Sequence, residues 1–398
     1  MTTLVNPDLI TDLQRFGAMQ VNACFSCGNC TATCPLADND ATFPRRFIRL
    51  AQVGLEADLV ASKELWTCYQ CGQCTSKCPT DADPAEFMAT SRRYAIAHYD
   101  RTGLARVMST RPVLGWLVAA LGVAFFSLFL LSTRGPASTE SLALFEFVPY
   151  HVIHWLGIGV MAVVALASLV GAVSLARDMA RKDGVRFRTL VGTAAGRAAA
   201  VRALWFSVGR ESLGQRRYRE DCKDDDPVEP LWRRRWIVHF VTLWGFLGLL
   251  AATTLDYGLD VLGIKETGAE VPLWYPTRLL GTVAGIALVY GVTVFMVNRV
   301  RADSSSYRVS TSTDWMFLVL LWLTGVTGFV IEVALYAPPT PAWGYAVFVV
   351  HVAIAMELLL FLPFTKFAHV MYRPIGLFFY GLAKNPVPVE ERERETVA

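Results

Sequence analysis

The chain has 398 residues, of which 54% are hydrophobic and only 18% are charged, with a formal net charge of +3. This length allows two or three domains, and this composition argues against an ordinary soluble enzyme and for a protein largely embedded in a membrane. The small net charge gives no sign of a nucleic-acid partner.

Residues 1–110 are predicted to form a small helical module. The opening stretch "MTTLVNPDLITDLQRFG" has neither the basic start nor the apolar core of a secretory signal, so we expect the module to stay in the cytoplasm. Segments 44–61 and 84–99 have apolar residues at helical spacing, and each begins with a proline, a common first residue of helices. No convincing alternating strand is present.

The module carries one cysteine pattern twice, as "CFSCGNCTATCP" (24–35) and "CYQCGQCTSKCP" (68–79). The run C-x2-C-x2-C-x3-C-P ligates [4Fe–4S] clusters, and its fourth cysteine binds the other cluster when two runs are present. Zinc sites usually pair two CxxC arms across a longer gap, and disulfides are rare in a reducing cytoplasm. The ninth cysteine, Cys222, lies alone in an acidic stretch and is expected to be a free thiol. The expected ligands are Cys24, Cys27, Cys30 and Cys78 for the first cluster, and Cys68, Cys71, Cys74 and Cys34 for the second.

Beyond residue 111 the chain becomes strongly apolar. Six spans are long enough to cross a bilayer, and this number argues against the buried core of a large soluble domain. The predicted spans are about 113–131, 150–176, 236–255, 276–298, 314–336 and 343–365.

The loops between the spans predict their orientation. Residues 177–235 hold fifteen Lys and Arg, and residues 299–313 hold three Arg, whereas 132–148 and 256–275 hold one basic residue each and 337–341 none. Because basic loops stay on the cytoplasmic side, both termini and the cysteine module are expected in the cytoplasm of a multi-pass inner-membrane protein. The basic stretch "TLVGTAAGRAAAVRALWFSVGR" is either an amphipathic helix on the inner membrane surface or a solvated loop.

Five of the six histidines lie in or at the ends of the spans, where ionisable side chains are costly and usually functional. The predicted topology puts His239 and His369 near the inner face. It puts His351 in the outer half, with His154 or His151, of which we prefer the deeper His154. His351 and His369 are eighteen residues apart, which on one continuous helix is five turns and about 27 Å on the same face. Two histidine pairs at two depths suit two b-type haems.

Two known families share these features. Residues 15–100 resemble the small iron–sulfur protein of heterodisulfide reductase, its C component, with two cysteine runs at this separation and "FPRRFIRLAQVGL" between them. Residues from about 145 to 380 resemble the cytochrome b of heterodisulfide reductase and the gamma subunit of respiratory nitrate reductase. In those proteins the final helix carries two haem-ligating histidines at the spacing of His351 and His369. The nitrate reductase protein has both partner histidines on one helix, whereas here the third span has only His239, with Leu249 at the second position.

The two halves in this order are similar to the C component of the quinone-interacting membrane-bound oxidoreductase family. This resemblance implies an all-α protein: a helical dicluster ferredoxin module, a six-helix transmembrane cytochrome b bundle over 111–380 with two haem b groups, and a cytoplasmic tail over 381–398. It implies one part of an enzyme, not active alone, that passes electrons between menaquinone and cytoplasmic flavoproteins similar to the A and B components of that complex. The resemblance further implies a link to adenylylsulfate reductase in dissimilatory sulfur metabolism.

Quinone chemistry moves two electrons and two protons, so it needs a proton-exchanging group in an apolar pocket. Glu332, near the outer end of the fifth span, or Lys265, in an outer loop, is expected to contact a quinone near the outer haem. Glu357 lies deeper in the sixth span, where a carboxylate is costly, and is a further candidate or a partner of a ligating histidine. A site beside His239 and the arginines before the third span is the rival.

Other functions remain open. The chain could serve a heterodisulfide-reductase-like or other quinol-linked complex with a different soluble partner, or be a redox-active membrane anchor without quinone turnover. A transporter is disfavoured because no broken-helix repeat is visible among the spans. No glycine-rich nucleotide motif stands in a strand–turn–helix context, so flavin is expected to come from a partner protein.

Overall fold

The computed structural model describes residues 4–37, 43–138, 142–221, 230–266, 271–302, 307, 309–336 and 342–384. Within these ranges every regular element is a helix, which confirms the all-α prediction. Cys222, the outer loop at 337–341 and all but the first few residues of the expected tail lie outside the described residues.

The N-terminal helices form the cysteine module, which we define as α1 to α6. The segment predicted to be helical over 44–61 is divided at Gly54, whose φ of +73° belongs to the left-handed region. A Cβ there would lie 2.5 Å from the carbonyl oxygen of Asn6, so the turn leaves room only for glycine. The elements are α1 (Leu9–Arg15), η1 (Val21–Ala23), α2 (Asn29–Ala32), α3 (Arg45–Gln52), α4 (Glu56–Val60), η2 (Lys63–Trp66), α5 (Gln73–Ser76) and α6 (Pro84–Tyr99).

Helix α6 is the centre of this module. It starts where the sequence predicted, with Pro84 in its first turn and the Asp83 side chain accepting a hydrogen bond from the Glu86 backbone N–H. Nearly all of its residues are buried, because it packs against α1, α3, α4 and η2. The module core is therefore a layer of apolar side chains around α6, including Phe47, Leu59 and Phe87.

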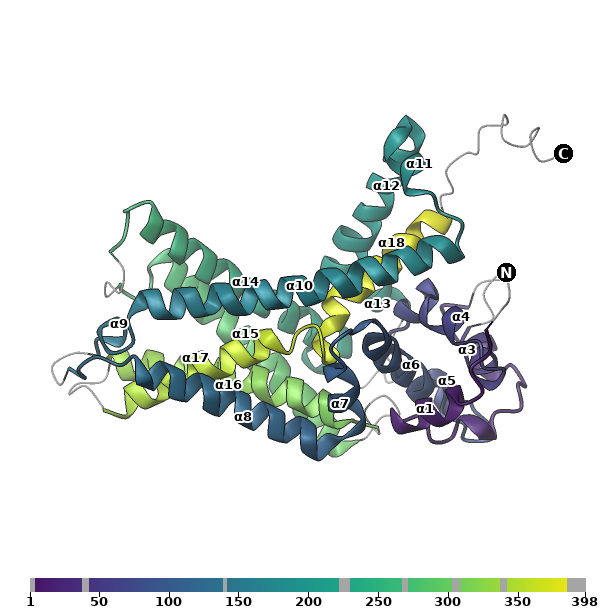
Figure 1. Cartoon of the computed structure of the whole chain (residues 1–398), viewed down its shortest axis with the longest axis horizontal. Coiled ribbons are helices and arrows are strands. Elements are labelled where there is room, and N and C mark those ends of the chain that lie inside the picture. Colours follow the sequence, from purple (N-terminus) through teal and green to yellow (C-terminus); the bar gives the residue numbers. More distant parts are fainter. Residues whose placement is uncertain are drawn as a thin grey trace.

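In the described part of the chain, six helices have the length and composition to cross a membrane, one in each predicted span. They expose many apolar side chains, such as Leu128 and Leu166, which a soluble protein would bury. Figure 1 shows the cysteine module at one end of the elongated molecule and the short helix α9 at the other. The spans are α8 (Pro112–Ser132), α10 (Tyr150–Lys182), α14 (Arg235–Val261), α15 (Pro276–Arg301), α16 (Ser312–Tyr336) and α17 (Trp343–Leu360), joined in part by α7 (Leu104–Thr110) and α9 (Leu144–Phe147).

The sixth span is shorter than predicted. The sequence favours a span over 343–365 whose helix continues to His369, with His351 and His369 on a single face, but α17 ends at Leu360. A turn and the short η5 (Lys366–Ala368) follow, and a separate helix, α18 (His369–Lys384), begins at the histidine. Pro363 lies in the turn, where its ring and its missing N–H disfavour a continuation of α17, so the expectation of one continuous helical face is wrong.

The basic stretch after α10 is helical, with its small residues Ala199 and Ala203 buried. It packs on α18, and in Figure 1 the pair α11 and α12 rises to one side of the bundle beside α18. Its location on a membrane surface stays a prediction. The elements are α11 (Phe187–Gly192), α12 (Ala194–Leu204), the π-helical η3 (Trp205–Leu213), α13 (Arg216–Asp221) and η4 (Leu231–Arg233).

Helix α18 packs against both the cysteine module and the spans. Trp66, two residues before the second cysteine run, stacks on Tyr372 of α18 with ring centroids 5.3 Å apart. The C-terminal end of α10 adds polar contacts, because Asp183, which follows it, accepts hydrogen bonds at 2.8 Å from Lys63 of η2. Apolar stacking and a partly buried ion pair thus join the same short segment of the module to two helices.

The contact between Trp66 and α18 gives a first test. A Cβ at Gly376 would lie 2.5 Å from the Trp66 Cβ, so Gly376→Ala must push the two elements apart. We expect a loss of roughly 1 to 3 kcal/mol in unfolding free energy from overpacking, although alanine favours the helix itself. Denaturant unfolding of the purified chain measures this. The control is Gly159→Ala in α10, where nothing lies within 4 Å of the added Cβ. Equal stability of the two variants would contradict the packing argument.

Candidate functional site

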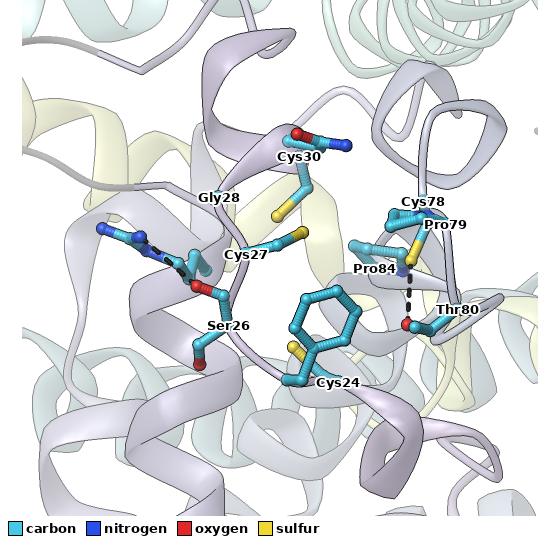
Figure 2. Close-up of a pocket in the computed structure, with 12 residues that line it drawn as sticks. Cys24, Ser26, Cys27, Gly28, Cys30, Cys78, Pro79, Thr80 and Pro84 are labelled. Carbon is cyan, nitrogen blue, oxygen red and sulfur yellow. Dashed lines mark hydrogen bonds between the residues drawn. The ribbon is translucent and has the colours of Figure 1, made fainter.

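The first cysteine cavity draws its thiols from both runs. Cys24, Cys27 and Cys30 line it together with Cys78, which comes from the second run. Figure 2 shows the four sulfur atoms around one shared space, with Pro79, Thr80 and Pro84 beside Cys78. Because the fourth thiol crosses over from the other run, the grouping matches the expected first ligand set.

The second cavity has the reciprocal composition. Cys68, Cys71 and Cys74 line it with Cys34 from the first run, and Met88 and Pro44 add apolar walls. The two cavities both open partly to solvent. The structure thus brings together the same two quartets that the sequence predicts.

Both runs share one backbone conformation. The residue before the second cysteine has positive φ in each run, 63° at Ser26 and 55° at Gln70. The glycine after that cysteine is also left-handed, with φ of 94° at Gly28 and 86° at Gly72, and a short helix follows each. This repeated turn directs three thiols of each run to one side, and the fourth leaves toward the neighbouring cavity.

Burial and the neighbouring thiols disfavour the deprotonated form of the cysteines when no cluster is bound. Burial, followed by the charges of Cys24, Cys27 and Cys78, raises the pKa of Cys30. Burial is also the main cause that raises the pKa of Cys34 to about 12, with Cys68 and Cys71 adding to it. Without iron these thiols stay protonated at neutral pH, so binding a positively charged cluster must release protons.

The donor set suits a polynuclear cluster. The thiols stand around a space, and their neighbours donate to sulfur: the Ala82 N–H to Cys78 Sγ at 3.4 Å and the Gln70 N–H to Cys68 Sγ at 3.3 Å. Such hydrogen bonds to sulfur tune the potential of iron–sulfur centres.

The predicted inner histidine pair is brought together. His239 of α14 and His369 of α18 have ring centroids 6.4 Å apart. Two imidazoles on opposite sides of one iron have ring centres roughly 6 Å apart, because each metal–nitrogen bond is about 2 Å long. His369 directs Nδ1 to the Lys366 carbonyl oxygen at 2.6 Å, which leaves Nε2 for a metal. His239 Nδ1 is buried without a hydrogen-bond partner among the described residues. These residues fit a bis-histidine haem.

The predicted outer pair is not brought together. His154 of α10 stacks on Tyr257 of α14 at 5.3 Å, whereas His351 of α17 shares a 2.9 Å hydrogen bond with the Thr327 hydroxyl of α16. No contact joins the two imidazoles in the described part of the chain, and the alternative His151 is exposed. The two side chains as placed do not fit a haem between them.

The two candidate quinone contacts each lie in an ion pair near the C-terminal ends of α14 and α16. Lys265 Nζ is 2.7 Å from Asp256 Oδ2, and Glu332 Oε1 is 3.5 Å from Arg278 Nε and accepts a 3.0 Å hydrogen bond from Thr282. Glu357 is 1% exposed and one of its oxygens has no partner among the described residues. It points at α8, where a Cβ on Gly122 would lie within 2.5 Å of the carboxylate.

Several arginines near the cavities were missed from the sequence. Arg45 of α3 lines the first cavity and contacts the Ser26 carbonyl oxygen at 3.5 Å. Arg92 of α6 and Arg373 of α18 both donate to the Cys68 carbonyl oxygen, at 2.7 and 3.2 Å. The sequence signal for these arginines is weak, because a basic residue near a span also fits the topology pattern of basic loops.

The comparisons with known proteins agree with this geometry. A family model described as "4Fe-4S dicluster domain" matches residues 20–82. "Citrate utilization protein B" of Escherichia coli is 30% identical over 165 residues, which are 41% of this chain and 41% of that protein. The C-type iron–sulfur component of CoB--CoM heterodisulfide reductase from Methanopyrus kandleri is 31% identical over 70 residues, 16% of this chain and 36% of that protein. The chain therefore spans about two fifths of the length of these relatives, and no solved structure matches it.

Residues 20–82 form a dicluster domain for two [4Fe–4S] clusters, joined to six helices of membrane-spanning length. The chain is a membrane-associated iron–sulfur electron-transfer protein related to the two proteins above.

Because each cavity takes its fourth cysteine from the other run, replacing that cysteine should remove the cluster of the other run. Cys78→Ser should lower the iron content from about eight to about four atoms per chain, and the lost cluster should be the one lost in Cys24→Ser. The two variants should therefore give the same electron paramagnetic resonance (EPR) spectrum in the reduced state, whereas Cys74→Ser should give the complementary one. Cys222→Ser, the control, should keep all the iron. A Cys78→Ser spectrum equal to that of Cys74→Ser would show that each run holds its own cluster.

Proposed function

We propose that this chain is the membrane electron-transfer protein of a quinone-linked oxidoreductase complex. In this proposal it passes electrons between menaquinone in the bilayer and flavoproteins of the same complex in the cytoplasm. The dicluster domain and the relation to an iron–sulfur protein of heterodisulfide reductase support a place in a multi-subunit complex. As in the sequence prediction, the cysteine module and both termini face the cytoplasm.

The observation that carries the proposal is the His239–His369 pair beside the second cysteine cavity. His369 begins α18, and one helical turn later Arg373 of the same helix contacts the Cys68 carbonyl oxygen. A haem at this pair would supply a one-electron carrier next to the iron–sulfur clusters. The chain's own part is to hold two imidazoles on separate helices, α14 and α18, at a spacing that one iron can bridge.

The quinone is proposed to bind at the outer ends of the spans, near His351. Thr327 of α16 contacts His351, and Glu332 lies five residues further along α16, about 7.5 Å toward the outer end. Oxidation of a quinol releases two electrons and two protons, and the carboxylate of Glu332 would accept one of these protons. In the reverse direction, reduction of the quinone, the ammonium group of Lys265 would donate a proton. His154 and His351 are predicted to hold a second haem, for which their side chains would have to turn toward each other.

The soluble partners are proposed from the family resemblance. They are flavoproteins similar to the A and B components of the quinone-interacting membrane-bound oxidoreductase family, with adenylylsulfate reductase beyond them. Cys27 and Phe25, exposed at the first cavity, offer the edge at which a partner could approach a cluster. Another soluble partner, in a heterodisulfide-reductase-like complex, is the alternative.

A second candidate function is a redox-active membrane anchor without quinone turnover. It is favoured by the ion pairs that already occupy Lys265 and Glu332, because side chains engaged with Asp256 and Arg278 are less free to exchange protons with a quinone.

The haem assignment is tested by substitution. His239→Ala and His369→Ala should each abolish the same b-type absorption band, since both imidazoles ligate one iron. His351→Ala should remove a second band together with His154→Ala. His98→Ala, on the exposed side of the cysteine module, should leave the haem content unchanged. Absence of any b-type band in the purified chain, or loss of one shared haem in His239→Ala and His351→Ala, would refute the pairing.

The quinone site is tested by pre-steady-state haem reduction with a menaquinol analogue. Glu332→Gln and Lys265→Ala should each slow the reduction several-fold, because each removes a proton-exchanging group beside the quinone. Glu220→Gln, a surface carboxylate that pairs with Arg216, is the control. Unchanged rates in both test variants, or an inhibitor bound beside His239, would place the quinone elsewhere or support the anchor.

A further inference from the structure

The backbone between Cys68 and Gln70 is held by arginines from three helices. Arg92 of α6 donates to the Cys68 carbonyl oxygen at 2.7 Å, and Arg373 of α18 donates to the same oxygen at 3.2 Å. Arg235, the first residue of α14, donates to the Gln70 carbonyl oxygen at 3.2 Å. The loop that lines the second cavity is therefore attached to α14 and α18, both outside the cysteine module. Among the described residues, the hydrogen bond from Arg45 of α3 to the Ser26 carbonyl oxygen holds the corresponding loop of the first cavity from within the module.

The two arginines from outside the module are placed regularly relative to the inner histidines. Arg235 precedes His239 by four residues on α14, and Arg373 follows His369 by four residues on α18. Four residues are about one helical turn, or about 6 Å of rise. The imidazoles of the two helices thus face each other. One turn nearer the cysteine module, each helix also places a guanidinium group against the loop between Cys68 and Gln70.

Aromatic rings fill the space between this loop and the histidines. Tyr69, the residue after Cys68, stacks on Tyr218 of α13 with ring centroids 5.2 Å apart and planes 18° apart. Tyr218 in turn meets His239 edge to face at 5.7 Å. The Arg373 guanidinium lies 4.7 Å over the Tyr69 ring and closes the group from the other side. The described contacts run without a gap from a cysteine loop to a candidate haem ligand.

The geometry points to the second cavity, lined by Cys34, Cys68, Cys71 and Cys74, as the one whose cluster exchanges electrons with the His239–His369 site, across the Tyr69–Tyr218 ring pair. This inference rests on the proposed function, because it needs a haem at that site. Each exchange moves one electron: one centre is oxidised by one electron, the other is reduced by one, and the tyrosines stay in their ground state as packed positioning residues. The first cavity, with exposed Cys27, is then the end that faces a soluble partner.

The arginines add an electrostatic consequence. A positive charge stabilises the reduced, more negative state of a nearby redox centre, and net charge is one of the factors that set the potential of iron–sulfur clusters. Arg373 contacts the second-cavity loop and lies one turn from His369, so it should raise the reduction potentials of both centres. The first-cavity cluster has no such contact with Arg373 among the described residues.

The test uses the purified full-length chain, in which dithionite reduces the oxidised centres while haem absorbance and freeze-quenched cluster EPR signals are followed. Tyr218→Leu removes the middle ring. We expect the cluster signals to develop at the wild-type rate and haem reduction to slow by about an order of magnitude, with unchanged midpoint potentials. The control is Tyr380→Leu in α18, which breaks a ring stack with Phe206 of η3; neither ring lines a cysteine cavity. It should leave haem reduction unchanged.

Two further variants keep the proposal falsifiable if Tyr218→Leu fails to assemble. Cys34→Ser should slow haem reduction, whereas Cys78→Ser, which removes the first-cavity cluster, should leave haem reduction by dithionite intact. Arg373→Gln should lower the midpoint potentials of the haem and the second-cavity cluster, and Arg373→Lys should restore them.

The results distinguish a failure of the proposed function from a failure of the electron path assigned to the second cavity. A chain without b-type haem refutes the proposed function. A haem that is lost in His239→Ala but is reduced at wild-type speed in Tyr218→Leu, or one whose reduction depends on Cys78 and not on Cys34, overturns this inference and leaves the proposed function standing.

Discussion

Each cysteine cavity needs one thiol from the other run, and this exchange constrains the whole N-terminal module. Because Cys78 must reach the first cavity and Cys34 the second, the segment between the runs has to leave and return to the same place. It does so as α3, α4 and η2, packed around α6. Neither ligand set is complete until both runs are in position, so cluster assembly and folding of the module are coupled. A partly assembled module would expose buried thiols without their iron.

The same short segment that completes the module also joins it to the spans. Trp66 leads directly into the second cysteine run and stacks on Tyr372, while the carbonyl oxygens of Cys68 and Gln70 accept from arginines of α18 and α14. The second cavity is thus held from two sides, by its own module and by helices beyond it. Some of the basic residues at the ends of the helices therefore also donate hydrogen bonds to backbone carbonyl groups beside the second cavity.

The sequence predicted the helical fold, the six spans and the grouping of the eight cysteines, because these depend on local periodicity and on ligand spacing. The predicted depths of the histidines in the membrane also paired His239 with His369, whose rings lie close together. The same pairing by depth failed for His154 and His351, because depth says nothing of the direction in which a side chain points around its helix. The turn after Leu360 was missed because hydropathy stays high through Phe361 and Phe364, although Pro363 was visible. The ring pair of Tyr69 and Tyr218 joins residues distant in the chain, which no local pattern reveals.

Because a turn separates α17 from α18, His351 and His369 lie on two separate helices. His351 belongs to a span surrounded by other spans, whereas His369 begins a helix seated on the cysteine module. Spans adapt to bilayers of different thickness by tilting. Such tilting would carry His351 with it, and the turn at Phe361–Ala368 would absorb the change before it reached α18. The distance from His369 to the second cavity should therefore be insensitive to lipid chain length.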